Sequence, residues 1–407
     1  MPDNLIGLVG IAAIIGIAVL ISGNRRAINL RIVGSAFALQ AAIAAFVLYS
    51  TLGQNMIATM SFGVQKVIDF SKEGINMVFG GLASESVGFS FAINVLPIII
   101  FFSALMSVLY HLKIMQWVVK LVGGALQKII GTRAVESLNA AANIFIGQTE
   151  APLVVRPYLA GLTEPQMFAI MVSGVASIAG TVLAAYVLMG AEMKYLLAAS
   201  FMAAPGGLLM AKLIMPDDES PGAEEDGELR MEDSKHVNVI LAAAVGAGDG
   251  VRLAVNIGAM LIAFVALIAL FNGVVGGLAS LAGIEDLTLQ KMLGWVFAPL
   301  MYLLSVPWSE AQAAGALFGE KLILNEFVAF SHMNDMLAGT SPRTQAIATF
   351  SLAGFANLSS IAILLGGLGS LVPEKRELIA RFGIRAVAAG SLSNLMSAAL
   401  AGLLIGL

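Results

Sequence analysis

Residues 173–180 read Ser-Gly-Val-Ala-Ser-Ile-Ala-Gly, and residues 353–360 read Ala-Gly-Phe-Ala-Asn-Leu-Ser-Ser. In both stretches small and polar residues interrupt a long apolar run at matching places, with an offset of 180 positions. A backbone that leaves the helix inside lipid must be buried in protein or line a cavity, because lipid offers its N–H and C=O groups no partner. The two stretches therefore predict a pair of broken membrane helices, and these decide the fold.

The composition agrees with a membrane protein. Of the 407 residues 58% are apolar and 12% charged, whereas soluble proteins carry about 25% charged residues. The mean hydropathy is +0.90. A soluble enzyme and a disordered or fibrous chain are excluded. Cysteine is absent, so disulfides and thiolate metal sites are excluded too. The net charge is −4 and there is no basic tract, so we expect no nucleic-acid partner.

Eight apolar runs are long enough to cross a bilayer, which takes about 20 residues. They lie at 5–21, 32–52, 94–110, 166–190, 193–215, 251–282, 345–372 and 383–407. No small-residue cleavage site follows the first run, so a signal peptide is the weaker interpretation of that run. Residues 54–92 are amphipathic and predict a segment that lies along the membrane interface.

Basic residues predict the orientation, since Lys and Arg concentrate on the cytoplasmic side. Eight spans place the three basic clusters inside if both termini are periplasmic or extracellular. The clusters are Arg25, Arg26 and Arg31; Lys113, Lys120, Lys128 and Arg133; and Lys375, Arg376, Arg381 and Arg385. Residues 217–235 hold nine of the 26 acidic residues. They predict a solvated cytoplasmic linker within 216–250.

The two broken runs belong to two similar units. An interrupted segment with a carboxylate precedes each run, Gln148-Thr149-Glu150 in the first unit and Asn325-Glu326 in the second. One extra span, 251–282, separates the units, and an odd number of crossings inverts the second unit. Inverted repeats whose broken helices meet near the bilayer midplane are typical of secondary transporters.

Glu150 and Glu326 lie in apolar surroundings. A carboxylate inside the membrane costs at least a few kcal/mol, so it needs a partner or a function. The alternative is a helix-end carboxylate that pairs with Arg156 or Lys321. We favour a functional role for both glutamates, because each lies at a predicted hairpin tip.

The neutral polar residues near the breaks leave two interpretations open. Gln148 and Thr149 either satisfy a re-entrant turn or bind a polar ligand. Asn143, Asn357 and Ser360 either contribute packing hydrogen bonds or line a site. The three histidines lack metal-binding spacing, and there is no nucleotide-binding loop or hydrolase signature. We therefore expect no enzyme and no cofactor.

Six segments resemble the concentrative nucleoside transporter family, and the resemblance covers essentially the whole chain. GQTEAP, NEFVA and GFANLSSIA are together very specific for it. The segments are AANIFIGQTEAPLVVRPYL (141–159), SIAG (177–180), ASFMAAPGGLL (199–209), VPWSEA (306–311), LNEFVAF (324–330) and GFANLSSIAILLGGLGSL (354–371).

The resemblance implies an all-α polytopic membrane protein that assembles as a homotrimer. It implies a scaffold, and a transport region that moves like an elevator and is coupled to Na⁺ in many members and to H⁺ in others. Residues 1–133 and 251–282 would form the scaffold. Residues 134–215 and 288–407 would form the transport region, with re-entrant hairpins at 134–160 and 306–335.

The resemblance also implies the roles of individual residues. Gln148, Thr149 and Glu150 face the nucleobase, with Val182 and Phe355 beside it. Glu326, Asn357 and Ser360 face the ribose, whose vicinal hydroxyls can donate charge-assisted hydrogen bonds to a carboxylate. The sodium ligands implied are the side chains of Asn143 and Ser177 with the carbonyls of Ile146, Ser177 and Ile178.

The sequence thus predicts a sodium-coupled symporter for uridine-like nucleosides in a bacterial inner membrane. A proton-coupled carrier of the same family is the first alternative. The neutral oxygens of Asn143 and Ser177 favour sodium, whereas a proton route would use a carboxylate such as Glu150. The second alternative is a membrane-embedded enzyme, and the third is a passive channel.

Overall fold

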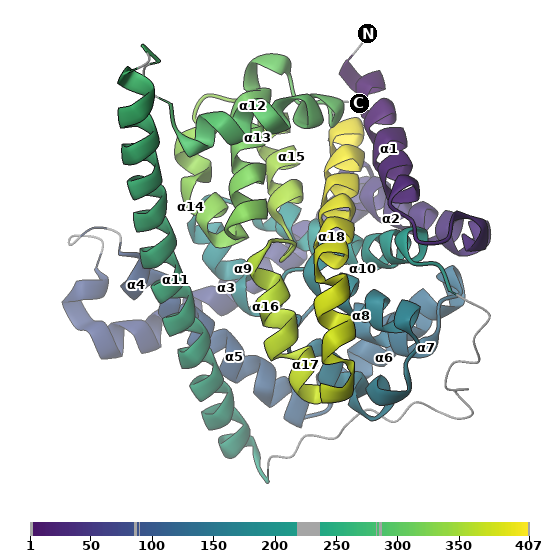
Figure 1. Ribbon diagram of the computed structural model, residues 1–407. Helices are drawn as coiled ribbons and strands as arrows, with labels where there is room; N and C mark the ends of the chain where they lie inside the picture. The colour runs from purple at the N-terminus through teal and green to yellow at the C-terminus, as the bar shows by residue number, and fades with distance from the viewer. Residues whose placement is uncertain are drawn as a thin grey trace.

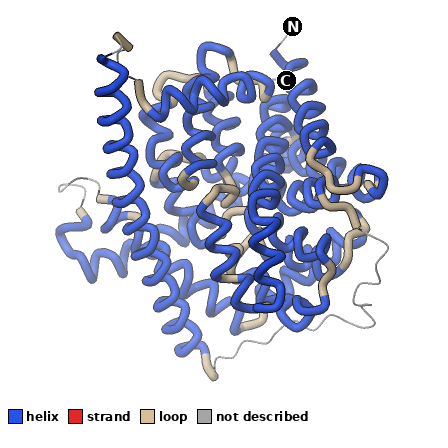
Figure 2. Tube along the Cα trace, viewed as in Figure 1, coloured by secondary structure: helices blue, strands red, loops and turns tan. Residues whose placement is uncertain are grey.

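The computed structural model describes residues 3–84, 88, 90–217, 237–281, 283–284 and 287–405. Within these ranges helices are joined by loops and turns, and there is no strand (Figure 2). The predicted all-α fold is confirmed. Residues 218–236, which carry most of the predicted acidic linker, lie outside the described ranges.

One group of helices lies at the periphery and exposes large apolar side chains, for example Leu30 at 80% and Ile262 at 77% exposure. Such side chains suit a bilayer rather than water. The group consists of α1 (Asp3–Leu20), α2 (Leu30–Tyr49), α3 (Thr51–Phe79), α4 (Phe91–Asn94), α5 (Leu96–His111) and α11 (Val239–Leu281). Figure 1 shows α11 as a long rod along one side of the molecule.

The remaining helices form two units with the same succession of elements. The first unit contains α6 (Ile114–Ile130), α7 (Ala134–Ala142), η4 (Ala151–Gly161), α8 (Glu164–Ala176), α9 (Gly180–Leu188) and α10 (Met193–Ile214). The second contains α12 (Leu289–Leu303), α13 (Trp308–Ile323), α14 (Glu326–Met336), α15 (Pro342–Leu352), α16 (Ser359–Gly366), α17 (Leu368–Leu371) and α18 (Arg376–Ile405). In Figure 1, α6 lies near the lower end of the molecule and α12 near the upper end.

The predicted offset of 180 between the units is two residues too long. Thr163 caps the N-terminus of α8 and Ser341 caps that of α15, 178 positions later. Gly180 N–H, at the start of α9, donates to a carbonyl of the first hairpin at 3.0 Å, and Leu358 N–H, again 178 positions later, donates to one of the second hairpin at 3.0 Å. The two N-caps and the two N–H donors share the offset of 178, whereas the helix ends at the breaks do not, since α8 ends at Ala176 and α15 at Leu352.

The apolar helices agree with the predicted spans. Six helical segments among the described residues are long and apolar enough to cross a membrane, and the bent pair of α12 and α13 would make a seventh. The other two predicted spans, 5–21 and 345–372, correspond to α1 and to the broken pair of α15 and α16. The helices α12 and α13 meet at an angle of 117°.

The helix α11 begins at Val239, whereas the sequence predicted a linker up to residue 250 and a span from 251. Two glycines, one turn apart, explain the longer helix. An ideal Cβ on Gly246 would lie 2.7 Å from the Ser103 carbonyl oxygen of α5, and one on Gly250 would lie 2.6 Å from Ile100 Cα. Only glycine allows this close approach of two helices, as is common in membranes.

Both predicted breaks are confirmed, because α8 ends at Ala176 before α9 and α15 ends at Leu352 before α16. The side chain of Asn394 in α18 forms hydrogen bonds to both breaks. Its side-chain nitrogen donates to the Ala176 carbonyl at 2.7 Å and to the Ala353 carbonyl at 3.0 Å. Carbonyl groups freed by both breaks are thereby satisfied inside the protein, as a membrane environment requires.

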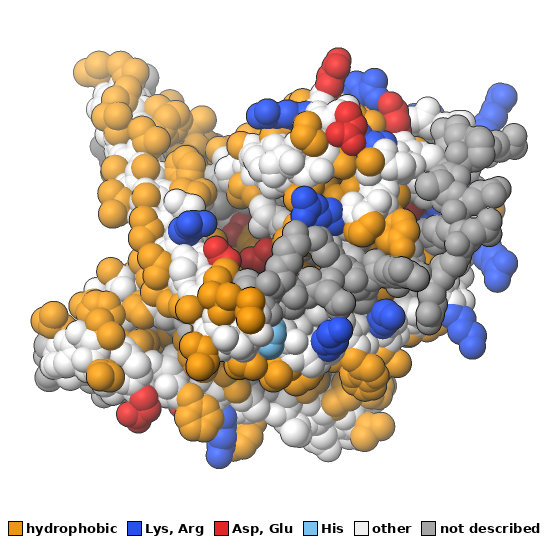
Figure 3. Space-filling model, turned by 90° about the horizontal axis from the view of Figure 1, so that it is seen from below, with side chains coloured by type: hydrophobic (Ala, Val, Ile, Leu, Met, Phe, Trp, Pro, Cys, Tyr) orange, Lys and Arg blue, Asp and Glu red, His pale blue; other side chains and the backbone are white. Residues whose placement is uncertain are grey.

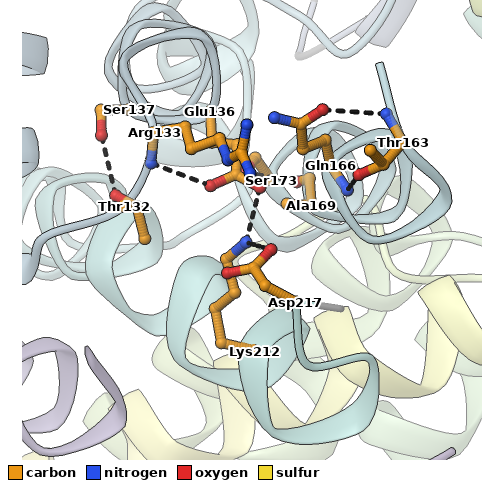
Figure 4. Close-up of polar contacts among 10 residues, drawn as sticks. All are labelled: Thr132, Arg133, Glu136, Ser137, Thr163, Gln166, Ala169, Ser173, Lys212 and Asp217. Carbon is orange, nitrogen blue, oxygen red and sulfur yellow. Dashed lines mark hydrogen bonds and ion pairs between the residues drawn. The ribbon is translucent and has the colours of Figure 1, made fainter. Parts of the chain in front are cut away.

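A buried ion pair fastens the base of the first hairpin (Figure 4). Lys212 Nζ of α10 lies 2.6 Å from Glu136 Oε1 of α7 and 2.6 Å from Asp217 Oδ1. The Lys212 and Glu136 side chains are only 3% and 0% exposed. Arg133 N–H also donates to Glu136 Oε2 at 3.2 Å. No sequence pattern predicts this pair.

Candidate functional site

The two breaks meet at the centre of the molecule. Phe355 N–H donates to the Ser177 carbonyl at 3.1 Å. These two residues are 178 positions apart, so each is the counterpart of the other in the two units. Counterparts of a repeat can be in contact only where the pseudo-twofold axis passes. The contact therefore places that axis between the two broken helices.

Glu326 is the anchor of a polar cluster at this centre. It is the first residue of α14, after the N-cap residue Asn325, and is 3% exposed. Its Oε1 accepts a hydrogen bond from the Tyr186 hydroxyl at 3.1 Å, and its Oε2 accepts one from Asn357 Nδ2 at 2.9 Å. A helix N-terminus favours a negative charge, and this offsets part of the cost of burying a carboxylate.

A row of hydrogen bonds continues from Glu326 to the first hairpin. Asn357 Oδ1 accepts from Ser360 N–H at 2.9 Å, and Gln148 Nε2 donates to Ser360 Oγ at 3.3 Å. The Ser360 hydroxyl also donates to the Phe355 carbonyl. Four of the predicted site residues, from two hairpin tips and one break, are thus brought together.

The repeat explains why these residues converge. Gln148 and Glu326 are 178 positions apart, and so are Val182 and Ser360. Each pair consists of counterparts that approach the pseudo-twofold axis from opposite units. Gln148 Oε1 is buried without a hydrogen-bond partner among the residues that the structure describes, so it is available to a ligand donor.

The other predicted residues surround this row. Val182 is buried and Phe355 is half-buried. Thr149 and Glu150 follow Gln148 in the same turn but are exposed, and the hydrogen-bonded row does not include them. The Thr149 methyl group packs against Gly367, where an ideal Cβ would lie 2.7 Å from it. Figure 3 shows acidic side chains inside a hollow on the face seen from below.

The predicted sodium ligands lie where the first hairpin meets the first break. Asn143 ends α7; its Nδ2 donates to the Asn139 carbonyl at 2.9 Å. Its Oδ1 is buried and has no partner within the described ranges. The Ser177 hydroxyl donates to the Ser173 carbonyl at 3.1 Å, which leaves its lone pairs available. These neutral oxygens fit a sodium ion, and Ile146 and Ile178 are buried beside them in the chain.

Tyr186 is a site residue that the sequence analysis missed. It lies on α9, one turn after Val182, and is fully buried. Its ring stacks on Phe330 of α14, with centroids 4.5 Å apart, and this packing directs its hydroxyl to Glu326. A tyrosine within an apolar run gives no sequence signal. Its helical spacing of four from Val182 is the one pattern that connects it with the site.

These features define a class of protein. An all-helical membrane protein whose inverted repeats place hairpin tips and broken helices around a buried polar centre is a secondary transporter. Residues 9–82 match the family model for the N-terminus of Na⁺-dependent nucleoside transporters, residues 195–402 match the model for their C-terminus, and residues 92–193 match a nucleoside-recognition gate model. The chain belongs to the concentrative nucleoside transporter family, and it is a sodium-dependent nucleoside transporter rather than an enzyme.

Similar proteins agree over the full chain. Nucleoside permease NupC of Helicobacter pylori is 49% identical and covers 100% of this chain and 99% of its own length. Sodium/nucleoside cotransporter 2 of Rattus norvegicus is 37% identical and covers 99% of this chain and 63% of its own length. The structure of CNTnw in an inward-facing substrate-bound state is 52% identical, with a TM-score of 0.95 and coverage of 100% and 98%. An outward-facing CNTnw variant gives 51% identity and a TM-score of 0.96, with coverage of 99% and 99%.

Proposed function

We propose that this transporter is a symporter that uses the sodium gradient to bring uridine-like nucleosides into a bacterial cell. The observation that supports the site most strongly is the row from Tyr186 through Glu326, Asn357 and Ser360 to Gln148. Within this row the Glu326 carboxylate comes from the second unit, and the Gln148 amide comes from the first. A nucleoside also has two chemically different ends, and each end of the row suits one of them.

The ribose would bind at the Glu326 end. Glu326 carries a buried carboxylate whose two oxygens each accept one hydrogen bond, one from Tyr186 and one from Asn357. A carboxylate fixed in this way can accept hydrogen bonds from two vicinal hydroxyls. Ser360 would add a further hydroxyl. A site that pairs both ribose hydroxyls rejects analogues that lack them, because its own polar groups are left unpaired.

The nucleobase would bind at the Gln148 end. The free Gln148 Oε1 can accept from a base donor. Thr149 and Glu150 follow in the same turn and supply a hydroxyl and a carboxylate. Val182 and the half-buried Phe355 supply apolar contacts for the flat faces of the base. The mixed polar character of this end matches the donor and acceptor edge of a base.

The binding of sodium would be coupled to the binding of the nucleoside through residues of the first break. Asn143, Ser177 and the carbonyls of Ile146 and Ile178 would bind the ion. The Ser177 carbonyl also accepts from Phe355 N–H at 3.1 Å. An ion at Ser177 therefore orders the residue that contacts the base, and we expect each ligand to raise the affinity for the other.

We propose that the transport region comprises 134–215 and 288–407 and moves as an elevator against a scaffold of 1–133 and 251–282. The exposed apolar faces of the scaffold helices suit contacts within a homotrimer as well as with lipid. Both termini would be periplasmic. Figure 1 places them together at the upper end, while α6 and α17, which carry or adjoin two of the basic clusters, lie toward the lower end.

Sodium coupling at this site predicts the effect of Asn143→Ala. We expect the variant to need about tenfold more Na⁺ for half-maximal uridine uptake, because a lost ligand oxygen costs on the order of 1–3 kcal/mol. Uptake into proteoliposomes is measured under a Na⁺ gradient and under a pH gradient alone. Asn55→Ala, at an exposed position of α3, is the control. Uptake driven by the pH gradient alone would refute sodium coupling, and an unchanged Na⁺ requirement in Asn143→Ala would refute the site.

Tyr186→Phe tests the support of the carboxylate. The variant loses one hydrogen bond to Glu326, and a bond to a charged group contributes about 1.5–3 kcal/mol. We expect uridine affinity to fall about tenfold or more, while affinity for 2′,3′-dideoxyuridine, already weak, changes little. Calorimetric titration measures both constants. Tyr195→Phe on α10 is the matched control, and an equal loss for both nucleosides would contradict the assigned role.

A further inference from the structure

Lys321 is a buried cation that the functions described so far do not use. It lies on α13 in the second hairpin and is 0% exposed. Its Nζ donates to Asn394 Oδ1 at 2.8 Å and to the Ser351 carbonyl at 3.2 Å. The ring of Phe318 lies 5.6 Å from Nζ. The Asn394 oxygen, the Ser351 carbonyl and the Phe318 ring each present negative electrostatic potential to the ammonium nitrogen.

Several groups around Lys321 offset part of the cost of burying a positive charge. Ser351 is the next-to-last residue of α15, so its carbonyl belongs to the C-terminal, negative end of a half-helix. Half-helix ends of this kind coordinate cations in transporters with broken helices. Asn394 is already oriented, because its side-chain nitrogen donates to the Ala176 and Ala353 carbonyls. Its Oδ1 can therefore only accept, and it accepts from Lys321.

The repeat relates this position to the sodium site. At the offset of 178, Lys321 is the counterpart of Asn143, and Ser351 is the counterpart of Ser173. In the first unit the Ser173 carbonyl accepts from the hydroxyl of Ser177, a proposed sodium ligand. In the second unit the equivalent carbonyl accepts from the Lys321 ammonium group. In both units this carbonyl therefore accepts a hydrogen bond from a polar side chain, a hydroxyl group in the first unit and an ammonium group in the second.

We propose that the Lys321 ammonium group is a covalently attached counterpart of the coupling sodium ion. It occupies the junction of the second hairpin with α15, so that the protein needs one sodium ion, at the first junction, rather than two. This inference rests on the assignment of the sodium site to Asn143 and Ser177. It gives the second hairpin, which carries Glu326, a cation that remains bound throughout the transport cycle.

Lys321→Ala tests the proposal because it removes the ammonium group and leaves space for an ion. We expect uridine uptake in proteoliposomes to fall at low Na⁺ and to recover at high Na⁺. The Hill coefficient for Na⁺ should rise from about 1 toward about 2, since a second ion site is then coupled to the first. Methylammonium added on both sides of the membrane should restore uptake at low Na⁺. A Hill coefficient and uptake equal to those of the unaltered protein would overturn the proposal.

Two further variants decide the question even if Lys321→Ala fails to fold. Lys321→Met keeps the length of the side chain but removes the charge and leaves no room for an ion. We expect it to lose uptake at every Na⁺ concentration, with no rescue by methylammonium, whereas Lys321→Arg keeps at least part of the uptake. Full uptake by Lys321→Met would show that the charge is not needed. Lys194→Met, whose lysine is half exposed on α10, should match the unaltered protein.

The same experiment separates the two assignments. Asn143→Ala should weaken the response to Na⁺, whereas Lys321→Ala should add a second ion to it. A normal Na⁺ response in Asn143→Ala overturns the sodium site itself. A normal response in Lys321→Ala, together with an impaired one in Asn143→Ala, overturns the role of the lysine and leaves the sodium site intact.

Discussion

Glu326→Ala is expected to abolish nucleoside binding, with uridine affinity at least about 100-fold lower. Under the proposed assignment, two charge-assisted hydrogen bonds to the ribose hydroxyls would be lost, and each would contribute about 1.5–3 kcal/mol. The substitution also leaves the Tyr186 hydroxyl and the Asn357 amide without the acceptor they now share. Calorimetric titration of the purified transporter with uridine measures the loss.

The second hairpin provides a matched control for this variant. Glu320 is also buried, on α13, but its carboxylate accepts from Gln290 Nε2 at 2.7 Å and lies 3.0 Å from His332 Nδ1. It is not part of the row between Glu326 and Gln148. Glu320→Gln should therefore keep uridine affinity within a factor of about three. Uridine affinity that survives in Glu326→Ala would refute the ribose assignment, provided that the variant elutes as the unaltered assembly.

Removal of one charge from the pair of Glu136 and Lys212 should cause the largest loss of stability. Lys212 Nζ lies 2.6 Å from Glu136 Oε1, and both side chains are almost fully buried. Breaking such a pair leaves an uncompensated buried charge and costs about 3–5 kcal/mol. Glu136→Gln and Lys212→Met should each lower the midpoint of thermal unfolding in detergent. The double variant should recover much of the loss, because neither charge then remains.

An exposed ion pair of the same residue types is the control. Lys194 Nζ lies 2.6 Å from Glu192 Oε2, but both side chains are about half exposed. Such a surface pair contributes about 0–1 kcal/mol, so Glu192→Gln should barely change the unfolding midpoint. If Lys212→Met were equally mild, or the double variant as unstable as the two losses added together, the buried pair would not act as a coupled unit.

The parts of the fold predicted from the sequence are those with a local cause. Interrupted apolar runs predicted both broken helices, and carboxylates in apolar surroundings predicted the hairpin turns that carry Glu150 and Glu326. The residues of the hydrogen-bonded row, such as Asn357 and Ser360, were predicted because polar groups at a membrane break need partners. Lipid makes these signals strong, since every unpaired polar group in it is costly.

The features that the sequence did not predict depend on contacts between distant segments. The pair of Glu136 and Lys212 joins residues 76 positions apart, and Tyr186 meets Glu326 across 140 positions. The start of α11 was not predicted, because Gly246 and Gly250 are needed for the close packing of α11 against α5. Hydropathy does not reveal such a contact. The offset of the repeat was two residues too long for a related reason, because small residues by themselves specify no register.

The amide of Asn394 has a consequence for the energetics of transport. Because one side chain binds a carbonyl at each break, the two breaks cannot move apart without the loss of at least one of these hydrogen bonds. In the proposed elevator movement, the two breaks and the polar centre between them would therefore move as one body. Such a carrier has no built-in direction. The sodium gradient would then set the direction of net nucleoside transport, and a reversed gradient would drive nucleoside out of the cell.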